Sequence, residues 1–455
     1  MFNPSDIVYS RRLFLTRGVQ LLSIAGTLPM FLDRSAHAMA ADFAANPAGA
    51  GRPDHRVLVV VQLAGGNDGL NTVVPLGNDD YYKARPKLGV AQGSALKLTD
   101  QFGLHPAAVG FKKLYDAGDL AIVHSVGYPN PNRSHFRSTD IWTTGEPDKL
   151  GSSGWLGRYC DACCSGVDPG PANGAHALAR KDIDPAMALA LDVEPPPALQ
   201  GVKYLPLTFR PENGPRGKGN KAAMARQNAN SANDILTKLN GPEAMHDGMG
   251  AMAAHRTGAD QTEEFLQRTA LNARVYADKI RNISSSIENK GAYPQTGLGR
   301  DLKLVSQLIA SSLPTRVYYV KLGGFDTHAE QLQRHPRLLA ELSGGIAAFV
   351  EDLRQMGNLD RVTLMTFSEF GRRVHENGSG TDHGEAAPLF LAGGAVKAGL
   401  HGAFSSLAPS NLHRGDVPFT TDFRRVYATL LHNWLGANDV GILGRKFAPM
   451  GVLSV

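Results

Sequence analysis

Five short apolar runs constrain the fold of this chain most strongly, because each is rich in β-branched residues and each is followed by a polar or glycine-rich segment. The first run, RVLVVVQL at residues 56–63, lacks the alternation of a strand with one solvated face, so we expect both of its faces to be buried. Helical patterns lie between several of the runs, as in a doubly wound α/β fold. We therefore predict an α/β core with a mostly parallel sheet flanked by helices. The other four runs cover residues 120–126, 316–322, 361–367 and 388–392.

The first 40 residues have the pattern of an export signal. SRRLFL at residues 10–15 is a twin-arginine signature, and residues 19–32 form a moderately apolar run. A cleavage pattern of small residues follows, either AHA at 36–38 or AMA at 38–40. The apolar run is too short and too weakly apolar for a confident membrane span. We predict a signal peptide at 1–40 read by the twin-arginine export machinery, and a periplasmic or extracellular mature protein without a stable membrane span.

Charge and length limit the partners and the domain organisation. Residues 1–40 contain four arginines and two aspartates, so removing them lowers the formal charge from +5 to +3, which is too small to indicate nucleic-acid binding. The rest of the chain is long enough for a large α/β domain with an insertion. Residues 151–260 are rich in Gly, Pro, Asn and Ala and contain few strand patterns. We predict that 41–150 and 296–455 form the two parts of the core and that 151–295 is an insertion or cap.

Three cysteines lie together in the sequence YCDACC, at Cys160, Cys163 and Cys164. In an oxidising compartment, one local disulfide or another structural role is the favoured interpretation, and one thiol would be left over. Redox chemistry at this cluster is the alternative.

Two pairs of acidic and imidazole side chains follow predicted strands. Asp326 and His328 flank one threonine, and Asp382 and His383 are adjacent. Divalent metals take carboxylate and imidazole ligands of this kind. Ligands in open α/β sheets bind beyond the carboxyl ends of the strands, so these pairs could converge on a metal. The alternative is that they are polar loop residues that satisfy backbone groups.

A third carboxylate, Asp68, follows the first predicted strand in the sequence AGGNDGLN. Its glycines allow a tight turn and a close approach of the backbone to a ligand. The segment matches neither phosphate-loop pattern. Asp68 is therefore a candidate third metal ligand, and a turn-forming aspartate without a catalytic role is the alternative.

Ser134 is the candidate nucleophile, because it stands at a predicted helix start, where bound anions are favoured. Arg133 and Arg137 flank it and could stabilise charge that develops on a phosphoryl or sulfuryl group. A plain capping serine with solvated arginines is the alternative. No G-x-S-x-G sequence surrounds Ser134, which argues against an ordinary serine esterase.

Glu369, in the sequence SEFGRR, has two interpretations. It could orient a metal ligand, or it could pair with Arg372 or Arg373. We favour the pairing with an arginine.

Taken together, these motifs resemble a family of exported bacterial proteins known as domain of unknown function 1501. The resemblance covers most of the mature chain, and the combination of motifs is specific. Besides the twin-arginine leader, the matching segments are LAGGNDGLNTVVP (63–75), NRSHFRSTDIWTTG (132–145), GGFDTH (323–328), TFSEFGRRVHENGSGTDHG (366–384) and DFRRVYATLLHNWLG (422–436).

That family is similar in turn to the alkaline-phosphatase-like superfamily of phosphatases, sulfatases and phosphomutases. This resemblance implies an alkaline-phosphatase-like α/β core with two metals and a Ser or Thr nucleophile at a helix start. The spacing Asp-x-His in the first late pair departs from the superfamily's usual Asp-x-x-x-His. Carried over by position, the nucleophile and first metal site are Ser134, Asp68, Asp382 and His383, and the second metal site is Asp326 and His328.

The leading hypothesis is an exported metal-dependent hydrolase of phosphate or sulfate esters, acting on a small-molecule or polymer substrate. Its divalent metal would be zinc, calcium, manganese or iron. The alternative is a non-catalytic exported binding or assembly protein that retains the superfamily fold.

Overall fold

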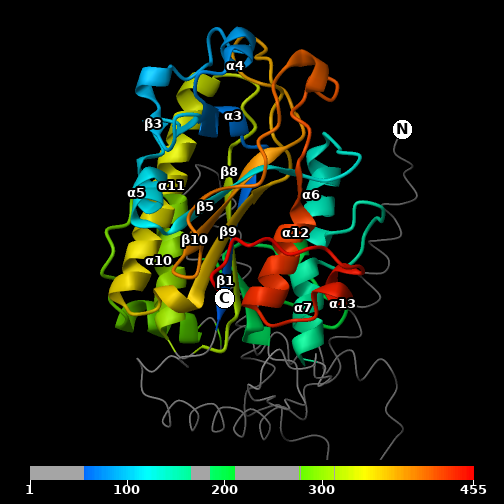
Figure 1. Ribbon diagram of the computed structural model, residues 1–455. Helices are drawn as coiled ribbons and strands as arrows, with labels where there is room; N and C mark the ends of the chain where they lie inside the picture. The colour runs from blue at the N-terminus through cyan, green and yellow to red at the C-terminus, as the bar shows by residue number, and fades with distance from the viewer. Residues whose placement is uncertain (1–55, 165–184, 211–275, 277, 312) are drawn as a thin grey trace, which may run out of the picture. The chain divides into compact units, whose positions relative to one another are not determined.

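A nine-stranded sheet forms the centre of the part of the chain that the structure describes (Figure 1). The computed structural model describes residues 56–164, 185–210, 276, 278–311 and 313–455. The predicted signal peptide at 1–40 lies outside them. The strand order is β11-β5-β10-β9-β1-β8-β6-β7, and β12 pairs with β5. These strands are β1 (Val57–Ala64), β5 (Leu120–Gly127), β6 (Ala188–Ala190), β7 (Leu207–Thr208), β8 (Val317–Gly323), β9 (Val362–Ser368), β10 (Ala387–Gly393), β11 (Gly399–His401) and β12 (Thr421–Asp422).

All five apolar runs predicted from the sequence are strands of this sheet, namely β1, β5, β8, β9 and β10. The central strand β1 is parallel to β8 on one side and to β9 on the other. All of its residues except the last are buried, which explains why its sequence shows no alternation. Burial of each Val or Leu side chain stabilises the fold by roughly 1.5–3 kcal/mol. The predicted α/β fold with a mostly parallel sheet is confirmed.

The direction of β10 determines which loops meet. β10 is antiparallel to both β9 and β5, so β5 runs in the same direction as β9, β1 and β8. The segments that follow these four strands therefore leave one edge of the sheet. Because β10 runs the other way, the segment that precedes it, which contains Asp382 and His383, lies at the same edge. The topology thus brings all the predicted site segments to one end of the sheet.

Helices cover both faces of the sheet. Helices α5, α10 and α11 lie on one side, and α6, α7, α12 and α13 lie on the other (Figure 1). The bounds are α5 (Val109–Ala117), α6 (His135–Thr144), α7 (Trp155–Cys164), α10 (Gly297–Ala310), α11 (Gln331–Gln355), α12 (Phe423–Ala428) and α13 (Asp439–Leu443), and a π-helical turn (Thr429–Trp434) continues α12.

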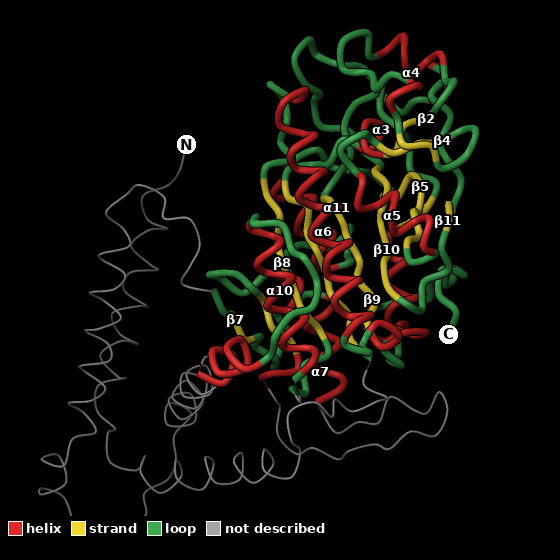
Figure 2. The backbone as a smooth tube through the Cα atoms, turned by 90° about the vertical axis from the view of Figure 1, so that its left-hand side faces the viewer, coloured by secondary structure: helices red, strands yellow, loops and turns green. Residues whose placement is uncertain are grey.

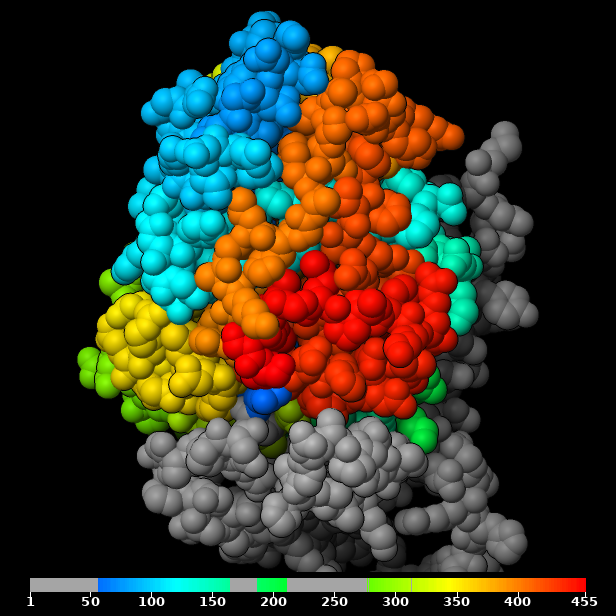
Figure 3. Space-filling model, in the orientation of Figure 1, coloured from blue at the N-terminus to red at the C-terminus, as the bar shows by residue number. Residues whose placement is uncertain are grey.

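A smaller three-stranded sheet lies at one end of the main sheet (Figure 2). Its own hydrophobic cluster joins early residues such as Leu70 and Tyr81 to late residues such as Val374 and Leu407. Figure 3 accordingly shows early (blue) and late (orange) segments side by side at this end. The elements here are α3 (Gly69–Thr72), β2 (Val73–Pro75), α4 (Asp79–Ala84), β3 (Leu96–Lys97) and β4 (Phe102–Leu104).

The segment predicted as an insertion, 151–295, is described only in part. Its described residues include α7 and the short strands β6 and β7, which extend the main sheet beyond β8. The domain boundaries therefore remain a prediction. Among the described residues, no helix is both long enough and apolar enough to cross a membrane.

Candidate metal centre

A glycine turn after β1 lets the site loops approach one another. Gly65 and Gly66 have φ values of 122° and 82°, which favour glycine. A Cβ atom on Gly65 would lie 2.3 Å from the backbone nitrogen of Asp326, and one on Gly66 would lie 2.4 Å from the ring of Phe370. The turn therefore needs both glycines, for their conformation and for the space that a side chain would occupy.

The buried side chain of Arg372 links the loops that meet at this edge of the sheet. Its side chain is buried and donates to the backbone carbonyl oxygens of Gly66 (2.8 Å), Thr381 (2.7 Å) and Phe325 (3.0 Å), and to that of Gly65. It also donates to Asp326 Oδ1 at 2.8 Å. One guanidinium thus fixes the segment after β1, the segment after β8 and the segment before β10.

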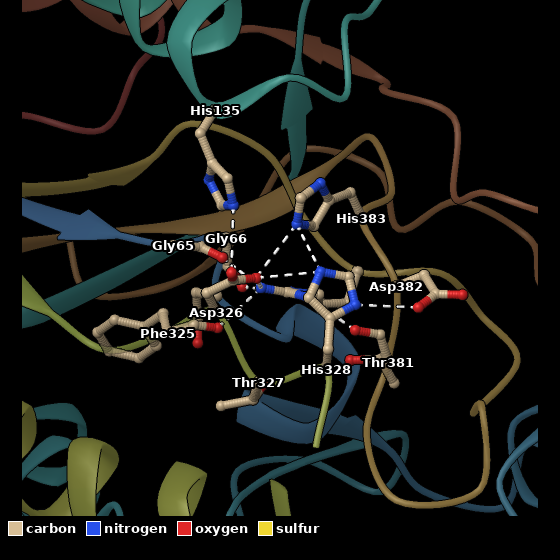
Figure 4. Close-up of polar contacts among 12 residues, drawn as sticks. Gly65, Gly66, His135, Phe325, Asp326, Thr327, His328, Thr381, Asp382 and His383 are labelled. Atoms are coloured by element: carbon tan, nitrogen blue, oxygen red, sulfur yellow. Dashed lines mark hydrogen bonds and ion pairs between the residues drawn. The ribbon is translucent and has the colours of Figure 1, made fainter.

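Three imidazoles converge on Asp326 (Figure 4). The Nε2 atoms of His328 and His383 lie 3.2 Å and 3.1 Å from Asp326 Oδ1, and His135 Nε2 lies 3.5 Å from Asp326 Oδ2. His328 Nε2 and His383 Nε2 are 2.8 Å apart. Ligand atoms of His135, Asp326 and His383 all lie within 4.8 Å of one another.

Each of these imidazoles is anchored through its other nitrogen, Nδ1. His135 Nδ1 lies 2.8 Å from Glu369 Oε1, and His328 Nδ1 lies 3.0 Å from Asp382 Oδ1. His383 Nδ1 lies 2.8 Å from the backbone carbonyl oxygen of Arg133. A carbonyl or carboxylate oxygen accepts a hydrogen bond, so each Nδ1 is the donor in these contacts and each Nε2 is the nitrogen that can bind a metal.

The charges in the cluster match this arrangement. Burial raises the pKa of Asp326, but the hydrogen bond from Arg372 and its positive charge outweigh that effect and lower the pKa to about 2. Hydrogen bonds from Asn377 and His328 lower the pKa of Asp382. Burial lowers the pKa of His383, which favours its neutral form. A carboxylate and neutral imidazoles are the forms that bind metals.

The donor set fits a divalent transition metal. Two ligand atoms bound at about 2.0–2.1 Å to one tetrahedral ion lie roughly 3.3 Å apart. Here the Nε2 atoms of His328 and His383 are 2.8 Å apart, and the three Nε2 atoms lie 3.1–3.5 Å from Asp326. Two lone pairs facing each other at 2.8 Å repel unless a proton or a cation lies between them. His135, Asp326 and His383 therefore fit such an ion as two nitrogen ligands and one oxygen ligand, and His328, beside Asp326 and His383, is the candidate fourth ligand. Calcium, which takes oxygen ligands, fits poorly.

The structure separates Asp68 from this cluster. Asp68 is fully buried and caps α3 by accepting from the backbone N–H of Asn71. Its Oδ2 accepts from Arg85 Nη1 at 2.6 Å and also from Gln331. Burial raises the pKa of Asp68, but the Arg85 charge and these hydrogen bonds lower it overall. Gln331 in turn accepts from Thr327 and Thr381, so Asp68 supports the ligand segments indirectly.

Ser134, the predicted nucleophile, directly precedes His135 in the sequence. Ser134 is the exposed N-cap residue of α6, and its side chain makes no capping hydrogen bond. It stands between Arg133, whose carbonyl oxygen binds His383, and His135. The guanidinium of Arg133 pairs with the buried Asp416. Arg137 pairs instead with Asp140 and the carbonyl oxygen of Pro147, so the structure does not bring it to the cluster.

The favoured interpretation of Glu369 was wrong. It pairs with neither arginine, because Arg372 pairs with Asp326 and Arg373 pairs with Asp416. Glu369 instead accepts from His135 and from the backbone N–H of Gly65.

In the cysteine segment, Cys160 and Cys163 are not joined by a disulfide, and the side chain of Cys164 is outside the described ones.

Sequence reasoning missed His135 as a candidate ligand. It lies immediately after Ser134, the predicted nucleophile, in a segment whose serine and two arginines were the predicted catalytic residues. The available signal was its position in the first turn of a helix after a strand end, the same edge at which the Asp-His pairs lie.

Solved structures similar to this chain include the C-terminal periplasmic domain of EcEptC from Escherichia coli in complex with zinc, at 10% identity and a TM-score of 0.32, covering 74% of this chain and 73% of that one. A sulfatase from Pseudoalteromonas sp. is 9% identical with a TM-score of 0.32, covering 78% and 65%. A phosphonate monoester hydrolase from Silicibacter pomeroyi is 11% identical with a TM-score of 0.29, covering 87% and 78%. Similarity at this level carries no conclusion about the activity of this chain.

No curated protein shows significant sequence similarity to this chain. A family model described as "Protein of unknown function (DUF1501)" matches residues 55–441, which include every strand of the main sheet and the whole candidate metal centre. The chain therefore belongs to the DUF1501 family.

Proposed function

We propose that this protein is an exported hydrolase of phosphate or sulfate esters that depends on a divalent metal. The observation that carries the proposal is that the Nε2 atoms of His135, His328 and His383 all lie within 3.5 Å of Asp326, with each Nδ1 anchored to an oxygen. Anchors of this kind fix the ring orientation of histidine ligands in metal sites. The donor set favours zinc, iron or manganese over calcium.

In this proposal, His135, Asp326, His328 and His383 hold the metal, and Asp382 orients His328. The ion would supply positive charge to stabilise the developing negative charge of the ester oxygens. Compared with the ligands predicted from the sequence, this set includes His135 and leaves out Asp68. It also combines residues of both late pairs at one centre.

Ser134 remains the proposed nucleophile. Its hydroxyl oxygen would form a bond to phosphorus or sulfur while the bond to the alcohol oxygen breaks, and the hydroxyl proton would pass through water to the departing alcohol oxygen. Water would then cleave the new ester and restore the serine. Ser134 also precedes a ten-residue helix as its N-cap residue, and the first backbone N–H groups of that helix favour an anionic group. Arg133 is the flanking arginine whose backbone contacts the cluster.

The test is turnover of aryl phosphate and aryl sulfate esters by the signal-cleaved protein. We expect activity that falls at least about 100-fold on chelation, in Ser134→Ala and in Asp326→Ala. Arg133→Gln should lower activity more than Arg137→Gln, the matched control in the first turn of α6, whose guanidinium pairs with Asp140. Undiminished turnover in Ser134→Ala and Asp326→Ala would refute the proposal. A metal-loaded protein without turnover on any ester would favour the non-catalytic binding or assembly role instead.

A further inference from the structure

Glu369 is a buried carboxylate that is only half satisfied. It directly follows β9, and its side chain is 3% exposed. Oε1 accepts from His135 Nδ1 and from the Gly65 backbone N–H, both at 2.8 Å. Oε2 is buried and has no hydrogen-bond partner among the described residues.

No lysine or arginine of the described residues pairs with Glu369, and its one ion-pair partner there is His135. A buried carboxylate without a cation, and with one oxygen unsatisfied, destabilises a fold. Such a group in a native structure calls for an explanation.

The surroundings hold Glu369 in place. The hydroxyl of Ser138 donates to its backbone carbonyl oxygen, and Tyr128 contacts Ser138 at 2.8 Å. The next residue, Phe370, packs against the rings of His135 and His383, with centroid distances of 4.9 Å and 4.5 Å. Glu369 is therefore fixed with Oε1 toward His135.

We propose that Glu369 is a positioning residue: it fixes His135 with Nε2 facing Asp326, and it does so while lowering the stability of the metal-free protein. A divalent ion on His135 would supply the missing positive charge one imidazole away from Glu369. The inference rests on the metal site of the proposed function. It does not depend on the ester chemistry or on Ser134.

The experiment compares Glu369→Gln with wild-type full-length mature protein. Glutamine keeps the shape and can accept at Oε1 from both donors, but it removes the charge. We expect the dissociation constant for zinc, measured by competition with a chromophoric chelator, to rise about 10–100-fold. We also expect the melting temperature of the metal-free protein to be unchanged or higher.

Glu385→Gln is the matched control. Glu385 is also a buried glutamate that contacts a histidine Nδ1, at 2.6 Å from His413, which lies outside the cluster. We expect its zinc dissociation constant to stay within about threefold of wild type. Zinc affinity in Glu369→Gln that is equally unchanged, or a lower melting temperature of metal-free Glu369→Gln, would overturn the inference.

Nitrogen NMR of the His135 ring in the metal-free wild-type protein tests the positioning separately. We expect the tautomer protonated at Nδ1 to dominate, and a dominant Nε2-protonated form would overturn the inference. If wild-type protein binds no zinc, the proposed function fails, and this ring measurement still decides whether Glu369 sets the tautomer.

Discussion

Replacing Asp68 distinguishes a metal ligand from a structural carboxylate. Asp68 and Arg85 form an ion pair at 2.6 Å in which both side chains are fully buried. Asp68→Ala removes the carboxylate but leaves the guanidinium in the core. A buried charge left in this way typically costs about 3–5 kcal/mol of folding free energy, and loss of the cap on α3 adds about 1 kcal/mol.

The remaining partners of Arg85 moderate this loss. Its guanidinium keeps hydrogen bonds to Asn71 Oδ1 and to the carbonyl oxygens of Arg373 and Val374. We therefore place the expected destabilisation near the lower end of that range, at about 4 kcal/mol in total. Equilibrium unfolding in urea of the metal-free protein measures it. Asp79→Ala, at an exposed aspartate in the first turn of α4, is the control and should cost less than about 1 kcal/mol.

Metal content decides the role of Asp68. The Asp68 oxygens contact Asn71, Arg85 and Gln331 rather than the three imidazoles, so folded Asp68→Ala should retain the metal. A variant that loses its metal while its stability falls by less than about 1 kcal/mol would refute this reasoning and restore Asp68 as a ligand.

Three further predictions concern the loops and the charges of the cluster. Arg372→Lys should lower stability by at least about 3 kcal/mol in urea unfolding, because one ammonium group cannot reach four carbonyl oxygens and Asp326. A loss below about 1 kcal/mol would contradict the role of Arg372 in fixing these segments. Gly65→Ala should weaken metal binding as well as stability, because its Cβ would meet the Asp326 backbone, whereas Gly77→Ala, also at positive φ but in open space, should affect stability alone. The pKa of Asp326 is lowered to about 2 in the folded protein, against an ordinary value of 3.8 for the unfolded chain. The contribution of its ionised form to folding stability is therefore complete above pH 4 and is lost as the pH falls toward 2. Because the side chain is 47% exposed, we expect this contribution to stay below about 2 kcal/mol. Asp326→Asn should therefore flatten the fall in the stability of the metal-free protein between pH 4 and pH 2, and an unchanged fall would contradict the lowered pKa of Asp326.

The core strands could be read from the sequence because their apolar runs are continuous. Burial on both faces leaves that pattern in β1 and β9, where almost every side chain is buried. The direction of β10 could not be read in the same way, because its run is equally apolar in either orientation. The position of Asp382 and His383 depends on that direction.

The site was predictable where the residue types carry the chemistry by themselves. Asp326, His328 and His383 were candidates from their spacing, and the structure brings them together. Asp68 has an equally suggestive context, but only tertiary contacts show that Arg85 and Gln331 engage it. Glu369 and His135 lie 234 residues apart, so their contact could not be inferred from local sequence.

Metal content of the signal-cleaved protein, purified without chelators or an affinity metal, tests the central claim most directly. We predict about one equivalent of a divalent transition metal per chain, lost in His135→Ala and Asp326→Ala. It should be retained in His375→Ala, an exposed histidine on the segment between β9 and β10. A folded wild-type protein that carries no metal and takes up none when offered zinc, manganese or iron would contradict the account.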